Sequence, residues 1–361
     1  MAKITVLGAG GWGIALAVLL HNNGHEVTIW SAVEREVNEI NETRENKVSL
    51  PGIVIPEKIK VSGDLDESVK DRDVLVMAVA SKFTRSTAAR LKGKVSKEQK
   101  IVNVAKGIEE DTLMTLTDVI EDEIGKDMDV CVLSGPSHAE EVGKGLPTTV
   151  VVGAKTKESA TYLQNIFMSP VFRVYISSDI LGIELGGSIK NVIALAAGMA
   201  DGLGYGDNTK AALITRGISE IARLGTAMGA KPVTLYGLSG IGDLIVTCAS
   251  MHSRNRRAGI LMGKGYTMKQ AQEEVHMVVE GVYSAKAAKK LADKYNIDMP
   301  IIQGVNQILF EDFSAAEAVN ELMNRDRKIE NADVDWIPIS KVAAKSRSVF
   351  HVVNTDDWSR L

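Results

Sequence analysis

Residues 3–20 of this chain read KITVLGAGGWGIALAVLL, and this stretch decides the fold. The apolar run Ile4–Leu7 is followed by a G-x-G-x-x-G pattern and then by an Ala- and Leu-rich run. In this pattern Gly8 permits a tight turn, Gly10 lets a pyrophosphate approach the backbone, and Gly13 allows close packing of a helix on a strand. The first turn of that helix offers free N–H groups to phosphates. The stretch predicts a strand–turn–helix unit that binds a dinucleotide, with a merely structural glycine turn as the alternative.

Short β-rich runs alternate with helical or turn-like stretches as far as about residue 176. They are Ile4–Leu7, Val27–Trp30, Val74–Val79, Ile101–Val104, Val130–Leu133, Thr148–Val152 and Phe172–Ile176. Several are nearly continuous in Val, Ile and Leu, as in strands that are covered on both faces. The alternation predicts an α/β fold with an N-terminal, Rossmann-type, mostly parallel sheet.

Strand signals stop after about Asp179, and the chain becomes rich in Ala, Leu, Met, Lys and Glu. This change indicates an all-helical C-terminal domain. We therefore expect a dinucleotide-binding domain over residues 1–185 and a helical substrate and catalytic domain over residues 186–330. Scattered Trp, Ser and Arg residues without periodicity indicate a C-terminal extension over residues 331–361, to which no function is assigned.

The composition is that of a soluble globular protein, with 361 residues, 45% hydrophobic and 24% charged. The net charge of −4 argues against a nucleic-acid partner, which requires clustered positive charge, but leaves an anionic small molecule possible. The two cysteines, Cys131 and Cys248, lie in apolar runs and do not indicate a disulfide framework. Since neither a signal peptide nor a bilayer-spanning stretch is evident, the sequence predicts a cytoplasmic protein without membrane insertion.

The choice between NAD and NADP is open. An acidic residue that reads the ribose 2′-hydroxyl usually follows the second strand, but this chain has Trp30–Val33 there. No arginine stands at the strand end either, although Arg35 is near.

Two polar elements follow predicted strands, at the edge where ligands bind in parallel sheets. The element Ala105–Gly107, which contains Lys106, comes directly after the strand Ile101–Val104. Ser134–Ser137 follows Val130–Leu133, with Ala139 opening the next helix. Each has an ordinary alternative: a solvated loop lysine for the first and a Gly-Pro turn for the second.

Two further elements lie in the helical half. Lys190 precedes a long apolar run, and burial there would lower its pKa towards the range of a proton donor or acceptor; the alternative is a lysine that extends to the helix surface. The stretch from Leu238 to Arg257 carries Asp243, suited to hold a lysine ammonium, and three arginines suited to a phosphate. Its alternative is a solvated basic turn.

The sequence predicts no metal site. His21 and His25 are four residues apart, but Asn22-Asn23-Gly24 interrupts the helix that would align them. The other histidines are scattered along the chain: His138, His252, His276 and His351.

Taken together and in this order, these motifs resemble the bacterial NAD(P)-dependent glycerol-3-phosphate dehydrogenase family over roughly residues 3–330. The motifs that carry the resemblance are GAGGWGIALA, AKGIE, LSGPSHAEEV, ELGGSIKNVIALAAGMADGLGYGDNTKAALITRG, LSGIGDLIVTC, HSRNRRAG and VVEGV. The resemblance implies a cleft between a dinucleotide-binding domain and a helical domain, in which NAD(P)H and dihydroxyacetone phosphate are converted reversibly to sn-glycerol 3-phosphate. It also implies a homodimer and a supply of product for glycerophospholipid synthesis.

The resemblance carries site residues over to this chain. Those against the cofactor are Gly11, Trp12, Lys106, Ala139, Arg254, Val278 and Glu280, beside the glycines of the turn. Those against the phosphorylated triose are Lys106, Gly135, Ser137, Lys190, Asp243, Ser253, Arg254 and Asn255, with Asn191 and Thr247 in the surrounding shell. Lys190 takes the role of catalytic acid and base, Lys106 adds electrostatic stabilisation, and Asp243 holds a lysine in position.

This chain departs from the family pattern in two places. Ala32-Val33 replaces a polar or basic pair common after the second strand, which makes use of NADH plausible, and Gly11 stands where serine is frequent. Two rival functions are a ketopantoate- or 6-phosphogluconate-type dehydrogenase and a non-catalytic redox sensor. The Ser253–Asn255 cluster argues against the first, and the joint presence of Lys106, Lys190 and Asp243 argues against the second.

Overall fold

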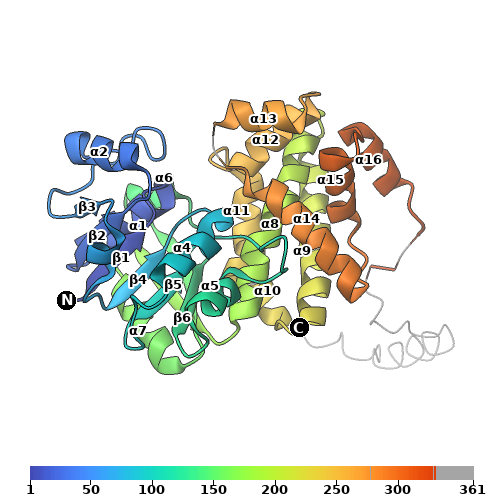
Figure 1. The fold of residues 1–361 in the computed structure, drawn as a ribbon. Coiled ribbons are helices and arrows are strands. Elements are labelled where there is room, and N and C mark those ends of the chain that lie inside the picture. Colours follow the sequence, from blue (N-terminus) through green and yellow to red (C-terminus); the bar gives the residue numbers. More distant parts are fainter. Residues whose placement is uncertain (277, 328, 331–361) are drawn as a thin grey trace, which may run out of the picture. The chain divides into compact units, whose positions relative to one another are not determined.

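The structure, a computed structural model, describes residues 1–276, 278–327 and 329–330. Its N-terminal half holds one eight-stranded sheet in the order β3-β2-β1-β4-β5-β6-β7-β8 (Figure 1). The strands are β1 (Lys3–Leu7), β2 (Glu26–Trp30), β3 (Lys60–Ser62), β4 (Val74–Met77), β5 (Lys100–Asn103), β6 (Asp129–Ser134), β7 (Thr148–Gly153) and β8 (Phe172–Ser177). Neighbours pair in parallel except β6 with β7, so the predicted mostly parallel, Rossmann-type sheet is confirmed.

Strand side chains feed two hydrophobic cores, one on each face of the sheet. Along β4, Val74 and Val76 belong to one core, and Leu75 and Met77 belong to the other. Because side chains alternate along a strand, a strand with both faces covered has few polar positions, which explains the nearly continuous apolar runs. The edge strand β3 was not predicted, since it is only three residues long and only one of them is apolar.

Helices cover this sheet and join its strands. They are α1 (Gly11–Asn22), α2 (Glu34–Thr43), α3 (Leu65–Val69), the 3-10 turn η1 (Ser81–Phe83), α4 (Thr84–Leu91), α5 (Leu116–Ile124), α6 (Ala139–Gly143) and α7 (Lys157–Phe167). Asp64 caps α3, since its side chain accepts from the backbone N–H groups of Asp66 and Glu67.

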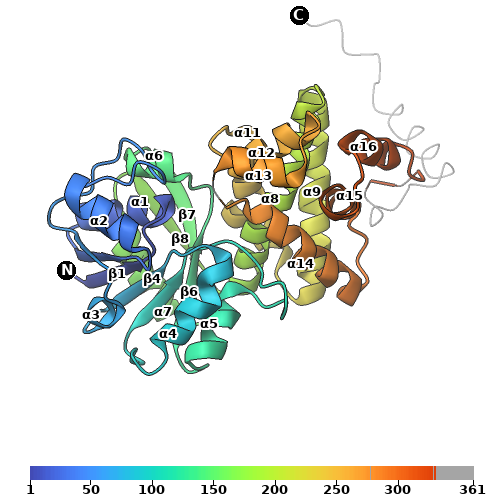
Figure 2. The same ribbon diagram turned by 45° about the horizontal axis from the view of Figure 1, so that its top comes forward.

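From Ile180 onward the described chain is helical. The elements are α8 (Ile180–Gly202), α9 (Asp207–Met228), α10 (Pro232–Leu235), the π-helical turn η2 (Leu238–Gly242), α11 (Asp243–Ala249), α12 (Arg254–Gly263), α13 (Met268–Val275), α14 (Glu280–Tyr295), α15 (Pro300–Phe310) and α16 (Ala315–Met323). The long helix α8 runs among α9, α11, α12 and α14 (Figure 2). Residues 1–322 form one compact unit, so the division at residue 185 stays a prediction, and the predicted extension over residues 331–361 lies outside the described residues.

Two apolar helical segments, each interrupted by at least one charged residue, have the length of a bilayer span. In Ile180–Gly202, 83% of the apolar window is buried inside the fold, and in Pro232–Ala249 the buried share is 39%. The first also carries Glu184 and Lys190, which are both buried and hydrogen-bonded to other elements of the fold. It is therefore the core helix of the helical half.

Helices α8 and α12 pack with their backbones in contact, through glycines four residues apart on each. A Cβ atom added at Gly198 would lie 2.1 Å from the Arg256 carbonyl oxygen, and one added at Gly259 would lie 2.2 Å from the Leu195 carbonyl oxygen. This packing holds α12, which follows Ser253, against the helix that carries Lys190.

We expect Gly259→Ala to lower the free energy of unfolding by about 1–3 kcal/mol, because the methyl group forces two backbones apart. Gly206→Ala is the control, since nothing lies within 4 Å of a Cβ atom at that position. Urea unfolding of both variants measures the difference. Equal stability of Gly259→Ala and the control would contradict the packing.

Two buried glutamates accept hydrogen bonds at helix N-termini. Glu184 accepts from the Thr117 backbone N–H at the start of α5 (3.0 Å), and Glu220 accepts from the backbone N–H groups of Ile301 (2.8 Å) and Ile302 (3.3 Å) at the start of α15. Burial raises the pKa of each carboxyl to about 7.

The raised pKa of Glu220 predicts a pH-dependent stability. In the unfolded chain the Glu220 carboxyl loses its proton near the ordinary glutamate pKa, but in the folded chain it loses it only near pH 7. The stability that the protonated carboxyl contributes is therefore fully present below the ordinary pKa and is lost as pH rises through 7. Glu220→Gln removes this loss of stability. The difference in unfolding free energy, variant minus wild type, is therefore expected to be about 3 kcal/mol larger at pH 8 than at pH 4.5. Denaturant unfolding at both pH values measures the difference. The exposed Glu273→Gln is the control, and parallel pH profiles for Glu220→Gln and wild type would refute the prediction.

Candidate active site

A cleft of about 640 Å3 runs along the carboxyl ends of the strands and is closed by residues of the helical half. It begins at the glycine turn. Gly8 has φ +126°, and a Cβ atom at Gly13 would lie 2.1 Å from the Gly8 carbonyl oxygen, so a side chain at Gly13 would push α1 off the turn. Nothing lies within 4 Å of a Cβ atom at Gly10, on the cleft side. This open backbone before the N-terminus of α1 fits the pyrophosphate of a dinucleotide.

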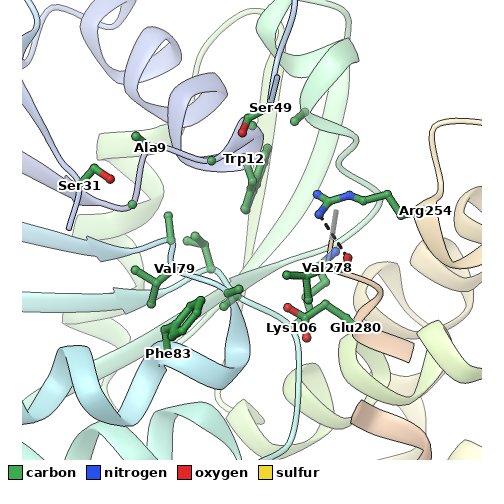
Figure 3. Close-up of a pocket in the computed structure, with 18 of the residues that line it drawn as sticks. Ala9, Trp12, Ser31, Ser49, Val79, Phe83, Lys106, Arg254, Val278 and Glu280 are labelled. Atoms are coloured by element: carbon green, nitrogen blue, oxygen red, sulfur yellow. Dashed lines mark hydrogen bonds between the residues drawn. The ribbon is translucent and has the colours of Figure 1, made fainter. Parts of the chain in front are cut away.

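Gly11 is constrained by a neighbouring loop. A Cβ atom there would lie 2.6 Å from the Ser49 carbonyl oxygen. Ser49 also lines the cleft beside Trp12 (Figure 3). Glycine at this position therefore lets the loop of Ser49 approach the helix start.

At the opposite end of the cleft, one buried carboxylate holds two lysines. Asp243 at the start of α11 accepts from the Lys190 ammonium at Oδ1 (2.6 Å) and from the Lys106 ammonium at Oδ2 (2.5 Å). Lys190 also donates to Thr247 Oγ1 (2.5 Å), and Lys106 donates to the Gly135 carbonyl oxygen (3.0 Å). Asp243 thus contacts both lysines, an arrangement that fits its predicted role as a holder of lysine.

Burial and charge set the protonation of this trio. Burial lowers the pKa of Lys190 to about 8, with Lys106 adding to the effect and Asp243 opposing it. Burial disfavours the Asp243 carboxylate, but the ammonium groups of Lys106 and Lys190 outweigh it and hold the pKa of Asp243 below its usual range. Lys190 is therefore a buried amine whose proton is exchangeable near neutral pH, as its apolar surroundings in the sequence indicated.

A polar chain fixes the residues around Lys190. Asn255 donates through Nδ2 to Asn191 Oδ1 (2.9 Å) and accepts at Oδ1 from the Gly281 backbone N–H (2.8 Å). Ser253 caps α12 by accepting from the Arg256 backbone N–H (3.2 Å). These bonds tie α8, α12 and α14 together at the wall of the cleft.

Arg254 and Glu280 enter the cleft from the helical half (Figure 3). Arg254 Nη1 donates to the Val278 carbonyl oxygen (3.5 Å), and Glu280 accepts from the Ser81 backbone N–H (3.2 Å) and from the Ser81 hydroxyl. Burial raises the pKa of Glu280. Glu280 therefore joins α14 to the start of η1.

Most of the predicted site residues line this one cleft. They are Gly8, Gly10, Gly11, Trp12, Lys106, Ser137, Ala139, Lys190, Asn191, Thr247, Ser253, Arg254, Asn255, Val278 and Glu280. Gly13, Gly135 and Asp243 lie behind its wall: Gly13 supports the turn, and Gly135 and Asp243 hold the lysines. Their roles towards ligands stay predictions.

Other residues of the cleft were not predicted. Three histidines that are scattered in the sequence, His138, His252 and His276, line the cleft, and the rings of His138 and His252 are 5.8 Å apart. Glu36 and Arg90 line the end of the cleft nearest β2. No sequence pattern singles these residues out, because they come from separate helices and loops. Among the described residues, no group of three His, Cys, Asp or Glu side chains could hold a metal ion.

Comparison with known proteins gives one consistent result. The family description NAD-dependent glycerol-3-phosphate dehydrogenase N-terminus matches residues 3–160, and the corresponding C-terminus description matches residues 179–320. Glycerol-3-phosphate dehydrogenase (NAD(P)+) of Fusobacterium nucleatum is 64% identical over 331 residues, covering 91% of this chain and 99% of that protein. The Bacillus subtilis protein of the same name is 49% identical over 336 residues, covering 92% and 97%.

A solved structure agrees with these relatives. The crystal structure of glycerol-3-phosphate dehydrogenase from Coxiella burnetii superposes with a TM-score of 0.87 and 38% sequence identity, over 90% of this chain and 99% of that one. Sequence and fold thus match along almost the whole described chain. The chain belongs to the NAD-dependent glycerol-3-phosphate dehydrogenase family.

Proposed function

We propose that this chain catalyses the reversible reduction of dihydroxyacetone phosphate to sn-glycerol 3-phosphate. The main support for the proposal is that the buried Asp243 holds Lys190 and Lys106, and that both lysines line the same cleft as an open dinucleotide turn. When bound, the reduced nicotinamide supplies the hydride that the ketone carbon receives. A non-catalytic sensor has no need of a buried lysine with a lowered pKa at the end of that cleft.

Lys190 and Lys106 act on the substrate carbonyl oxygen, where negative charge develops. Lys190 donates its proton to that oxygen in the reductive direction and takes it back from the hydroxyl in the other. Lys106 stays anchored to Asp243 and the Gly135 carbonyl and stabilises the developing charge from a fixed position. Asp243 keeps both ammonium groups in place.

Arg254, with Ser253 and Asn255 at the start of α12, holds the substrate phosphate. The Arg254 guanidinium has five donors and a single protein hydrogen bond among the described residues, the long one to Val278, so most of its donors are available to an anion. The bound phosphate is remote from the reacting carbon, and holding it orients that carbon for the reaction. Arg254, Val278 and Glu280 also lie where the cofactor would pass between the two halves.

The lowered pKa of Lys190 predicts opposite pH profiles for the two directions. Ketone reduction needs the ammonium form, so its kcat is expected to fall about tenfold per pH unit above pH 8. Alcohol oxidation needs the neutral amine, so its kcat is expected to fall similarly below pH 8. Initial rates from pH 6 to 10 in both directions measure this, and flat profiles in both would contradict the assigned role.

The proposal places the enzyme in the cytoplasm as a homodimer, acting in glycerophospholipid synthesis. It also treats residues 1–185 and 186–330 as the cofactor-binding and catalytic domains. Size-exclusion chromatography with light scattering tests the dimer, which would elute at about twice the monomer mass of 38.9 kDa.

The direct test follows the loss of reduced-nicotinamide absorbance with dihydroxyacetone phosphate, in parallel with NADH and NADPH. Turnover with either cofactor, with sn-glycerol 3-phosphate as product, supports the proposal. Ketopantoate and 6-phosphogluconate serve as rival substrates. Binding of cofactor without turnover of dihydroxyacetone phosphate would overturn the substrate assignment.

A further inference from the structure

The end of the cleft nearest β2 is where the adenosine half of the cofactor would lie. In a sheet of this topology the pyrophosphate sits at the start of α1, and the adenosine ribose lies over the carboxyl end of β2. Here that end is lined by Trp30, Ser31, Ala32 and Val33, and the reacting lysines lie at the other end. Figure 3 shows Ser31 on one side of the pocket and Lys106 and Arg254 on the other.

Two charged side chains line this end in the described part of the chain, Glu36 from α2 and Arg90 from α4. Glu36 is half-buried and held in place: the Ser31 hydroxyl, which is 4% exposed, donates to Glu36 Oε2 (2.6 Å). The same hydroxyl accepts from the Val33 backbone N–H (3.1 Å). Because that N–H occupies a lone pair of the hydroxyl, the Ser31 proton is directed at the carboxylate.

The second oxygen of Glu36, Oε1, has no hydrogen-bond partner among the described residues and belongs to a side chain that lines the cleft. A carboxylate oxygen only accepts hydrogen bonds, so it matches a ribose hydroxyl. It does not match a 2′-phosphate, which carries a charge of about −1.5 to −2 at neutral pH and would meet a fixed negative charge.

Arg90 does not make this end of the cleft favourable for a 2′-phosphate. Its guanidinium carbon lies 4.9 Å from the centre of the Trp30 ring, and the ring is fixed by its indole N–H, which donates to the Gly63 carbonyl oxygen (3.0 Å). Stacking over an aromatic face suits Arg90 to packing beside a flat base. Arg35, the cation nearest to Glu36 in sequence, is exposed and does not line the cleft.

We propose that Glu36, positioned by Ser31, accepts the ribose 2′-hydroxyl of the cofactor and makes NADH the preferred cofactor of this chain. This inference rests on the proposed function only in taking the cleft as a dinucleotide site. The acidic reader expected at the strand end is displaced by five residues, from Ser31 to the first turn of α2.

The experiment measures binding without turnover, by isothermal titration with NADH, NADPH, 5′-AMP and adenosine 2′,5′-bisphosphate. Wild type is expected to bind NADH at least tenfold tighter than NADPH, and 5′-AMP tighter than the bisphosphate. Glu36→Gln, which keeps the side-chain size and removes the charge, is expected to shrink both ratios about tenfold, chiefly through tighter binding of the 2′-phosphorylated ligand. Glu34→Gln is the matched control, because Glu34 lies in the same helical turn, is exposed and does not line the cleft.

Ser31→Ala and Arg90→Gln complete the design. Ser31→Ala is expected to shrink the two ratios of dissociation constants, NADPH to NADH and bisphosphate to 5′-AMP, less than Glu36→Gln does. Arg90→Gln is expected to bind NADH more tightly than NADPH, as wild type does. Equal or tighter binding of NADPH by wild type, unchanged ratios in Glu36→Gln, or selective loss of NADPH binding in Arg90→Gln would each overturn the inference. Since titration needs no substrate, a preference for NADH without turnover of dihydroxyacetone phosphate would refute the proposed function and leave this inference standing.

Discussion

Lys190→Ala is expected to lower kcat for reduction of dihydroxyacetone phosphate by about 10²–10⁴-fold, with little change in the Kd for NADH. Lys190 is 5% exposed, donates to Asp243 and Thr247, and is the cleft lysine with the lowered pKa. Removing it takes away the proton donor to the carbonyl oxygen but leaves the glycine turn untouched. Steady-state rates and NADH titration measure the two effects separately.

The loss could also arise from a disturbed fold, since Asp243 then keeps one ammonium partner instead of two. Lys190→Met controls for side-chain volume, and its melting temperature shows whether the helical half is intact. Lys210→Ala serves as a second control, because Lys210 pairs with Asp201 and does not line the cleft. A kcat within threefold of wild type in folded Lys190→Ala would refute the assignment of Lys190. If wild type bound the cofactor but showed no turnover, and Lys190→Ala bound it equally well, the result would instead favour a redox sensor.

The parts of the site that the sequence predicted are those fixed by local backbone chemistry. Gly8, Gly10 and Gly13 could be assigned because the turn requires an open backbone at short, fixed spacing, and each glycine has the geometry that its role demands. Lys190 could be singled out because a lysine before a long apolar run is conspicuous, and its burial follows from that run.

The rest depends on tertiary contacts that no local pattern encodes. Asp243 follows Lys190 by 53 residues and Lys106 by 137, and only the packing of α11 on α8 shows that it bridges them. Glu36 lies outside the strand end, where the acidic residue of a dinucleotide site usually stands, and it is placed at the cleft by the start of α2 and the hydrogen bond from Ser31. Similarly, β3 pairs at the sheet edge with β2 although its sequence is mostly polar.

Asp243→Asn is the second substitution with a large expected effect, because it removes the charge that both lysines share. Asp243 opposes the effect of burial on Lys190, so without its negative charge the pKa of Lys190 is expected to fall further. The alkaline limb of the kcat profile for ketone reduction should then move down by at least one pH unit. At pH 7.5, kcat should drop about 10²-fold, since less of Lys190 carries a proton and Lys106 loses its anchor.

If Asp243 had a merely structural role, Asp243→Asn would lower the stability of the protein without moving the alkaline limb of the kcat profile. Asp201→Asn is the matched control: Asp201 is a half-buried carboxylate of α8 that pairs with Lys210 and Arg256 and does not line the cleft. It is expected to lower the melting temperature and to leave the alkaline limb of the kcat profile in place.

Asp243→Glu keeps the charge on a longer side chain. It should restore the limb towards its wild-type position, while kcat stays reduced because the two ammonium groups are misplaced. An unmoved limb in Asp243→Asn would mean that the charge on Asp243 does not set the protonation of Lys190.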